Sequence, residues 1–192
     1  MLHSIIDFIL ASVDSWGYFG IFSLMFLESS FFPFPSEVVI IPAGYLVFEG
    51  KMSGFWVVFF GVLGSLAGAW FNYVLAYKFG RGFLEKFISK QKLDKMDKFF
   101  DKHGAISMFT GRLLPVFRQY ISFPAGLSKM NGFIFSVYTL LGSLIWIIIL
   151  TVLGYYIGDN KDLIDKYLNY ITIGIIVFLS FVILIYYKIK KK

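Results

Sequence analysis

The 192-residue chain contains no cysteine and only two histidines, His3 and His103. The lack of cysteine excludes disulfides and thiol chemistry. No group of His, Asp and Glu has the spacing of metal ligands, so we expect no metal site and no other cofactor. There is no P-loop, and no Ser/His/Asp set lies in the apolar segments. We therefore expect that the protein is not an enzyme.

Charged residues are also scarce. They make up 16% of the chain, against 58% hydrophobic residues, and the mean hydropathy is +0.74. Soluble domains carry roughly 25% charged residues. The 24 phenylalanines exceed what an ordinary soluble core holds. This composition excludes a soluble enzyme and a disordered tail, and it predicts a single transmembrane domain over residues 1–192.

The basic residues are concentrated in two places. The net charge is +6, and twelve of the eighteen Lys and Arg residues lie in 78–102 and 188–192. Both segments flank apolar spans instead of forming a folded basic face, so we expect no nucleic-acid partner. An excess of Lys and Arg marks cytoplasmic loops, which places the basic tail 188–192 in the cytoplasm.

Three segments are long and apolar enough to cross a bilayer, which takes about 20 residues. They are 55–77, 133–157 and 167–187, and none contains a charged residue. With the tail inside, the positive-inside rule places 78–104 inside, and it places 1–16, 49–53 and 158–166 outside. The connector 78–104 is amphipathic and predicts two short interfacial helices with a break near Lys90.

Two further segments, 17–48 and 105–130, are apolar but contain charges and prolines. As one helix, the 32 residues of 17–48 would extend about 48 Å, beyond a hydrocarbon core of about 30 Å. Two full spans would need about 40 residues. The flanks of each segment are assigned to the same side, so each segment predicts a re-entrant hairpin that breaks at its prolines.

The two hairpins resemble each other when the chain is shifted by 82 positions. Phe31-Phe32-Pro33 then lies over Leu113-Leu114-Pro115, and Pro42-Ala43-Gly44 lies over Pro124-Ala125-Gly126. Because one copy faces outside and the other inside, the repeat would be inverted. Inverted repeats with broken helices place the substrate sites of many transporters near the bilayer midplane.

The two hairpins carry opposite charges. The first contains Glu28 and Glu37, and the second contains Arg112 and Arg118. A charge at mid-depth costs roughly 2.5–3.5 kcal/mol on the mildest scale, so these residues either form structural ion pairs or line a binding site or pathway. Arginine favours an anionic ligand, because its forked donors match phosphate or carboxylate oxygens.

At these residues the sequence resembles the DedA family of bacterial membrane proteins, whose shared region is also called the VTT domain. The resemblance covers about residues 15–160 and rests on FLESSFFPFPSE (26–37), IIPAG (40–44) and FTGRLLPVFRQYISFPAGLSKMNG (109–132). It implies a multi-pass protein of the bacterial cytoplasmic membrane with two opposed re-entrant hairpins. For some members it implies translocation of undecaprenyl phosphate. Others handle different phospholipids or support the proton-motive force.

The combined prediction is an all-α lipid transporter that moves an anionic polyprenyl phosphate or phospholipid between leaflets. Arg112 and Arg118 would bind the phosphate, while Glu28 and Glu37 would pair with the arginines or carry protons. The alternatives are a proton-coupled carrier of small cationic solutes, with the glutamates as its site, and a non-transporting scaffold. The sequence leaves open the coupling ion, the direction of transport and a homo-oligomeric state. The residues expected at the hairpin breaks and as site lining are Pro33, Pro35, Ser36, Pro42, Gly44, Pro115, Gln119, Pro124 and Gly126.

Overall fold

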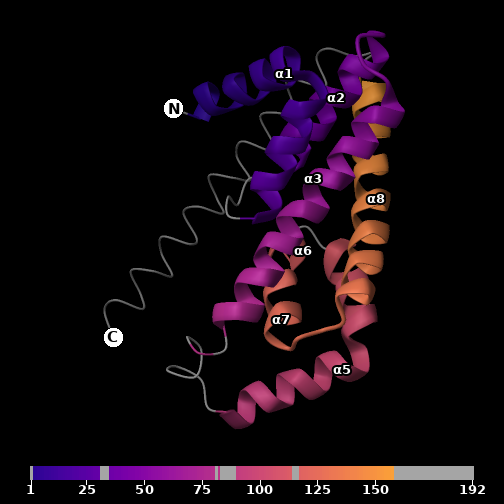
Figure 1. The fold of residues 1–192 in the computed structure, drawn as a ribbon. Helices are drawn as coiled ribbons and strands as arrows, with labels where there is room; N and C mark the ends of the chain where they lie inside the picture. Colours follow the sequence, from indigo (N-terminus) through magenta and orange to yellow (C-terminus); the bar gives the residue numbers. More distant parts are fainter. Residues whose placement is uncertain (1, 31–34, 81, 83–89, 114–116, 158–192) are drawn as a thin grey trace.

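The computed structural model describes residues 2–30, 35–80, 82, 90–113 and 117–157. Within these ranges every regular element is a helix, which confirms the predicted all-α class (Figure 1). The predicted span 167–187, the tail 188–192, Pro33 and Pro115 lie outside the described residues. The elements are α1 (Leu2–Ser30), α2 (Glu37–Phe48), α3 (Gly54–Leu75), the π-turn η1 (Ala76–Gly80), α5 (Lys90–Leu113), α6 (Phe117–Tyr120), α7 (Ser122–Leu127) and α8 (Gly132–Ile157).

Two of these helices are long and apolar enough to cross a membrane. They cover Gly54–Gly80, with 27 residues, and Gly132–Tyr156, with 25 residues, and so contain most of the predicted spans 55–77 and 133–157. At 1.5 Å per residue each exceeds the hydrocarbon core of about 30 Å.

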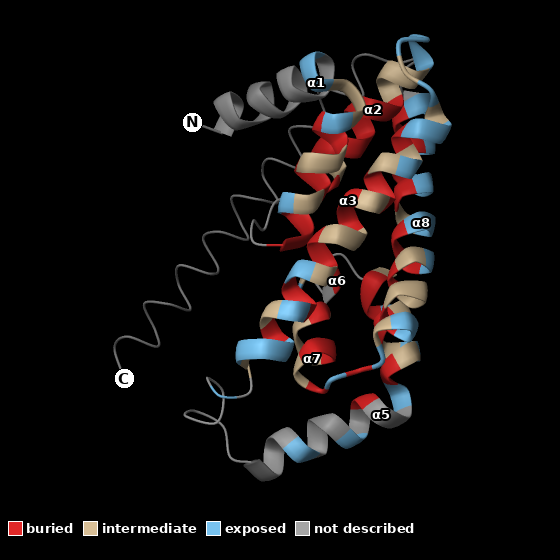
Figure 2. Ribbon diagram, in the orientation of Figure 1, coloured by how far each residue is buried: buried red, intermediate tan, exposed pale blue. Residues whose placement is uncertain are grey.

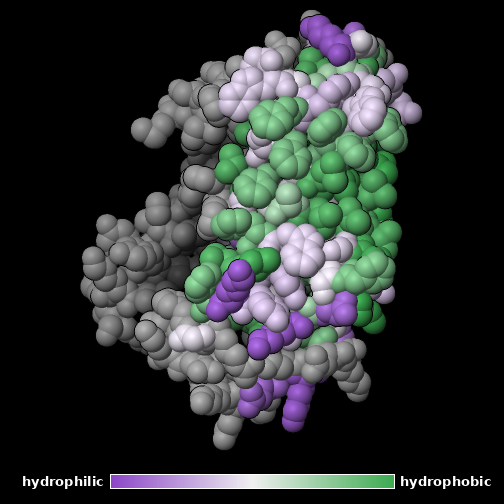
Figure 3. Space-filling view, viewed as in Figure 1, coloured by the Kyte–Doolittle hydropathy of each residue, from purple (hydrophilic) through white to green (hydrophobic). Residues whose placement is uncertain are grey.

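The outward faces of these helices are apolar. Phe55 of α3 is 70% exposed and Phe133 of α8 is 78% exposed, and both helices carry further exposed large apolar side chains. Exposed positions recur along α3 and α8 in Figure 2. The face seen in Figure 3 has a broad hydrophobic band with hydrophilic residues toward its two ends. Contiguous apolar surface of this kind is unfavourable in water and suits contact with lipid.

The first two helices pack on different spans. Gly17 of α1 has φ 56° and ψ −131°, a conformation that glycine adopts easily, and it separates a first segment from the part of α1 that lies along α3. Gly64 and Gly68 allow that close approach, because an added Cβ would overlap the carbonyl oxygens of Phe22 and Phe26. In contrast, α2 packs on α8.

Helices α5 and α7, from the second half of the chain, also pack on different spans. The C-terminal part of α5 lies along α8, where Gly142 contacts the Cβ of Arg112. Helix α7 packs on α3 and η1, with Gly126 against the backbone of Tyr73. Thus α1 and α7 share one span, and α2 and α5 share the other.

Helix α5 differs from the sequence prediction. The sequence predicts an interfacial segment that ends at 104 and a hairpin arm that begins at 105, whereas α5 is one helix of 24 residues across that point. Gly104 is tolerated within the helix because it packs against Met130. No proline interrupts Lys90–Leu113, so every residue of this segment can donate its backbone N–H within the helix.

Two apolar clusters lie at opposite ends of the bundle. One contains Ile21, Met25, Ile40, Val57 and Ile147, and the other contains Tyr73, Met108 and Phe135. Each span carries a buried serine between the parts that contribute to the two clusters, Ser65 on α3 and Ser143 on α8.

Candidate functional site

Three charged side chains are buried together where the broken helices meet. Glu28 lies near the C-terminal end of α1, Arg112 in the last turn of α5, and Arg118 in α6. Their exposed fractions are 2%, 3% and 7%. The structure therefore brings together the acidic residue of one predicted hairpin and both arginines of the other.

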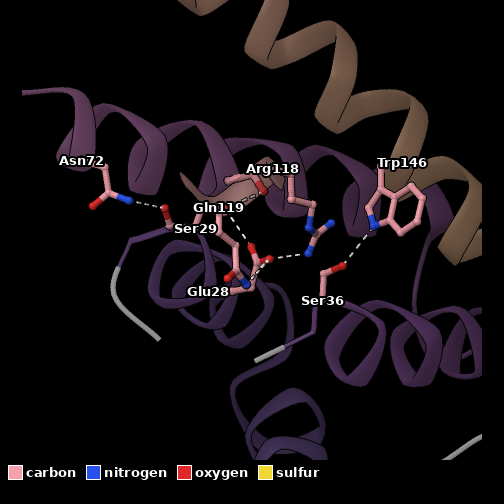
Figure 4. A network of polar contacts seen from close by, with 8 residues as sticks. Glu28, Ser29, Ser36, Asn72, Arg118, Gln119 and Trp146 are labelled. Atoms are coloured by element: carbon pink, nitrogen blue, oxygen red, sulfur yellow. Dashed lines mark hydrogen bonds and ion pairs between the residues drawn. The ribbon is translucent and has the colours of Figure 1, made fainter. Parts of the chain in front are cut away.

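Glu28 and Arg118 form a buried ion pair between Oε1 and Nη2 (Figure 4). Gln119 also donates to Oε1, at 3.3 Å, and the Ser29 hydroxyl donates to Oε2 at 2.8 Å. Both carboxylate oxygens of Glu28 are thus engaged.

Trp146 of α8 contacts the site from the other side of Arg118. The guanidinium carbon lies 5.5 Å from the centroid of the indole ring, in cation–π geometry. The indole N–H donates to the hydroxyl of Ser36, at 3.2 Å, just before α2 (Figure 4). Sequence reasoning missed Trp146, because a tryptophan within an apolar span is equally consistent with lipid contact.

Arg112 has different surroundings. Its Nη2 donates to the hydroxyl of Ser122 at 2.9 Å, and its Nε has no hydrogen-bond partner. Among the described residues Arg112 forms no ion pair. A fully buried cation therefore has one neutral acceptor and an unused donor.

Asn72 holds the end of α1 in place. Its amide donates to the carbonyl oxygens of Ser29, at 2.9 Å, and Ser30, at 2.8 Å. The last carbonyls of a helix lack partners within the helix, so these bonds satisfy two of them. The Ser29 hydroxyl also lies 3.1 Å from that of Ser65. These contacts to α3 position the turn that carries Glu28.

A small enclosed cavity lies among these groups. It is bordered by Glu28, Ser29, Ser65, Arg112, Arg118, Ser143, Trp146 and Ile147, and it has room for about one water molecule. A phosphate group is larger than that space. Binding of a headgroup here requires the surrounding helices to separate.

The remaining predicted residues lie beside this centre. Glu37, in the first turn of α2, is half-buried and forms no ion pair with either arginine, so the predicted pairing of Glu37 with an arginine is not found among the described residues. Ser36 and Gln119 contact the centre through Trp146 and Glu28. Pro35 is half-buried just before α2.

Two of the predicted breaks are absent. Helix α2 continues through Pro42, and Pro124 lies inside α7. Proline is tolerated in a first turn, which explains Pro124. Gly44 and Gly126 are packed against the spans instead of lining the cavity.

An all-helical apolar bundle with a buried charged centre defines an integral membrane protein with a polar site within its helices. Residues 34–156 match the VTT domain family. The chain belongs to this family, the DedA family, as its hairpin motifs indicated.

Several relatives match along most of their length. The chain is 38% identical to the uncharacterized membrane protein YkoX of Bacillus subtilis, over 93% of this chain and 82% of that protein. It is 33% identical to undecaprenyl phosphate transporter A of Bacillus subtilis, over 98% and 96%, and 27% identical to protein DedA of Escherichia coli K12, over 92% and 89%. No solved structure gives a significant match. These findings support a membrane location and a transporter role.

Proposed function

We propose that this protein moves a lipid with an anionic phosphate headgroup, such as undecaprenyl phosphate or a similar polyprenyl phosphate, between the leaflets of the bacterial cytoplasmic membrane. The observation that carries the proposal is the burial of two guanidiniums and one carboxylate at the meeting point of the broken helices. The relative named undecaprenyl phosphate transporter A, similar over nearly the full length of both chains, supports the choice of lipid.

The chemistry of the headgroup suits this centre. A phosphate monoester carries about −1.5 to −2 charges at neutral pH, and its oxygens accept paired hydrogen bonds from a guanidinium. The tail of the lipid remains in the hydrocarbon throughout, so only the headgroup needs a polar path. No bond is made or broken in this process.

The packing of the helices supports an inverted repeat as the basis of movement. Gly44 and Gly126, related by the 82-residue shift, both lie against the backbone of a span, Gly44 on α8 and Gly126 on α3. Gly64 of α3 packs against α1, and Gly142 of α8 packs against α5. The first helix of each half therefore packs on the span of its own half. In the proposed mechanism, each hairpin moves against the span of the other half and opens the centre to one leaflet at a time.

A carrier of small cationic solutes, with the glutamates as its site, is the competing function. One transport measurement separates the lipid carrier from the cation carrier. Purified protein is reconstituted in liposomes with a fluorescent short-chain polyprenyl phosphate, and an impermeant reductant then bleaches the label in the outer leaflet. We expect the protein to increase the bleached fraction above that of protein-free liposomes. No increase, together with uptake of a small organic cation, would overturn the lipid proposal.

The same assay tests how the headgroup is held. Arg118→Lys keeps the charge and removes the forked donors. Because a hydrogen bond to a charged group contributes about 1.5–3 kcal/mol, we expect transport to slow by about 10- to 100-fold. Lys98→Arg, at an exposed position of α5, is the matched control and should transport normally. Wild-type transport by Arg118→Lys would show that the arginine does not grip the phosphate with two donors.

A further inference from the structure

The two buried arginines differ in whether a carboxylate contacts them directly. Arg118 has Glu28 as its partner and the ring of Trp146 on its other side. Arg112 donates to one hydroxyl and its Nε has no hydrogen-bond partner. It forms no direct ion pair among the described residues, although Glu28 borders the same cavity. The sequence predicts the same role for both arginines, whereas the structure gives them different contacts.

We propose that Arg112 is the standing receptor for the phosphate, and that the Glu28–Arg118 pair adds a second contact only for a phosphate that carries more than one charge. The proposal rests on the function proposed above and extends it to substrate class. It makes this centre a selector of phosphate monoesters over diesters.

The first part follows from the cost of burying a charge that has no direct ion pair. Burying an ion is unfavourable unless it is paired and hydrogen-bonded. Arg112 is 3% exposed, and it borders the cavity with a donor that nothing in the described chain uses. Once the helices around the cavity separate, an anion that binds Arg112 relieves this cost without displacing a carboxylate from it. Arg112 is therefore the point at which an anionic headgroup binds first.

The second part follows from charge balance. Arg112, Arg118 and Glu28 together carry a net charge of +1. A phosphate diester carries one negative charge and balances Arg112 alone, which leaves the ion pair intact. A monoester carries about −1.5 to −2 charges, so balance requires the second guanidinium. Glu28 must then leave Arg118 or take up a proton.

Trp146 makes this exchange feasible. The face of an indole ring attracts a cation, so Trp146 can hold the guanidinium of Arg118 while the carboxylate moves away. Its N–H bond to Ser36 connects that arginine to the start of α2. Exchange of partners at Arg118 is therefore transmitted to the first hairpin. A monoester would open the centre more readily than a diester would.

The test uses two probes with the same tail and different charge, farnesyl phosphate and its monomethyl ester. Affinities are measured for the full chain in nanodiscs. We expect the wild type to bind the monoester at least roughly tenfold more tightly, because only the monoester recruits a second charged hydrogen bond. The charge-balanced variant Glu28→Gln/Arg118→Gln should bind both probes with nearly equal affinity, close to that of the wild type for the diester.

Variants of Arg112 give the converse result. Arg112→Gln should weaken binding of both probes by at least roughly tenfold. If Arg112→Gln does not fold, Arg112→Lys takes its place in the test, because lysine keeps the buried charge. Arg112→Lys should retain the preference for the monoester. Lys98→Gln, at an exposed position, controls for general loss of positive charge.

The outcomes separate the inference from the function on which it rests. If the double variant loses both probes as completely as Arg112→Gln does, or if it keeps the monoester preference, the division of roles is wrong and the carrier function stands. If Arg112→Gln binds both probes as the wild type does, Arg112 is not the receptor. If the folded wild type binds neither probe, the proposed function itself fails.

Discussion

Glu28 and Glu37 are the same residue type, nine positions apart, in very different surroundings. Glu28 is buried and accepts hydrogen bonds from Arg118, Gln119 and Ser29. Glu37 is half-buried in the first turn of α2, where a carboxylate interacts favourably with the helix dipole. Glu37 thus has a favourable interaction within its own helix, whereas the contacts of Glu28 with Arg118 and Gln119 come from the second half of the molecule.

Neutralising each glutamate should therefore have unequal effects. Glu28→Gln leaves Arg118 buried without a carboxylate, and breaking a buried pair in this way costs about 3–5 kcal/mol. Glu37→Gln removes a favourable dipole interaction of about 0.3–1 kcal/mol. Thermal unfolding in detergent, followed by circular dichroism, should show a large fall in Tm for Glu28→Gln and a small one for Glu37→Gln.

For Glu28→Gln, the affinity for the phosphate should rise although the thermal stability falls. Glu28→Gln frees Arg118, so the folded variant should bind farnesyl phosphate more tightly than the wild type does, while Glu37→Gln should bind it with unchanged affinity. A fall in affinity for Glu37→Gln equal to that of an arginine variant would place Glu37 in the binding centre instead of beside it.

The sequence was sufficient to nominate some of these residues and not others. Glu28, Arg112 and Arg118 are conspicuous because charges within apolar segments are costly and need a reason. Trp146 and Ser122 carry no such signal, since both residue types are common in membrane helices. Asn72 is polar within an apolar span, and its position alone leaves open a helix–helix hydrogen bond or a place in the cavity lining. The choice of Glu28 over Glu37 as the partner of Arg118 depends on how the helices meet across the breaks, which no spacing in the chain specifies.

At the scale of helices, glycine contacts determine which element packs on which span. Gly44 of α2 and Gly154 of α8 face each other, and an added Cβ at Gly154 would overlap the carbonyl oxygen of Ile41. Such contacts suit membrane helices, where association relies on close packing because lipid offers no hydrophobic driving force between helices. The sequence predicted the spans from their length, but the partners of α2 and α7 follow from these contacts.

Enlarging one of these glycines should loosen a specific helix pair. Gly154→Ala places a methyl group against backbone that cannot rotate away, and overpacking of this kind costs typically about 1–3 kcal/mol. Gly54→Ala is the matched control, because its Cβ would meet only a side-chain carbon of Val47 at 3.6 Å. We expect a lower Tm for Gly154→Ala and an unchanged one for Gly54→Ala. Equal stability of the two variants would show that α2 does not pack on α8 at this point.

At the scale of the whole molecule, charge is distributed unevenly between the two ends of the bundle. The turn between α2 and α3 carries Glu49 and Lys51 as an ion pair. The opposite end carries Lys78, Lys129 and the basic first part of α5, which lies across that end in Figure 1. An excess of Lys and Arg faces the cytoplasm, so we propose that α5 and the C-terminal tail lie inside and the α2–α3 turn lies outside.

This orientation can be tested directly, because a chain without cysteine accepts single cysteines on its natural background. Lys51→Cys and Lys98→Cys replace exposed side chains at the two ends of the bundle. In intact cells a membrane-impermeant maleimide should label Lys51→Cys, and it should label Lys98→Cys only after the cells are permeabilised. Lys190→Cys, in the predicted cytoplasmic tail, should behave as Lys98→Cys does. The reverse labelling pattern would show that the protein has the opposite orientation, so that each hairpin enters from the other leaflet.

Labelling of Lys51→Cys and Lys98→Cys from the same side would mean that α3 does not cross the bilayer between them. The opposed hairpins, and with them the path proposed for the headgroup, would then be wrong.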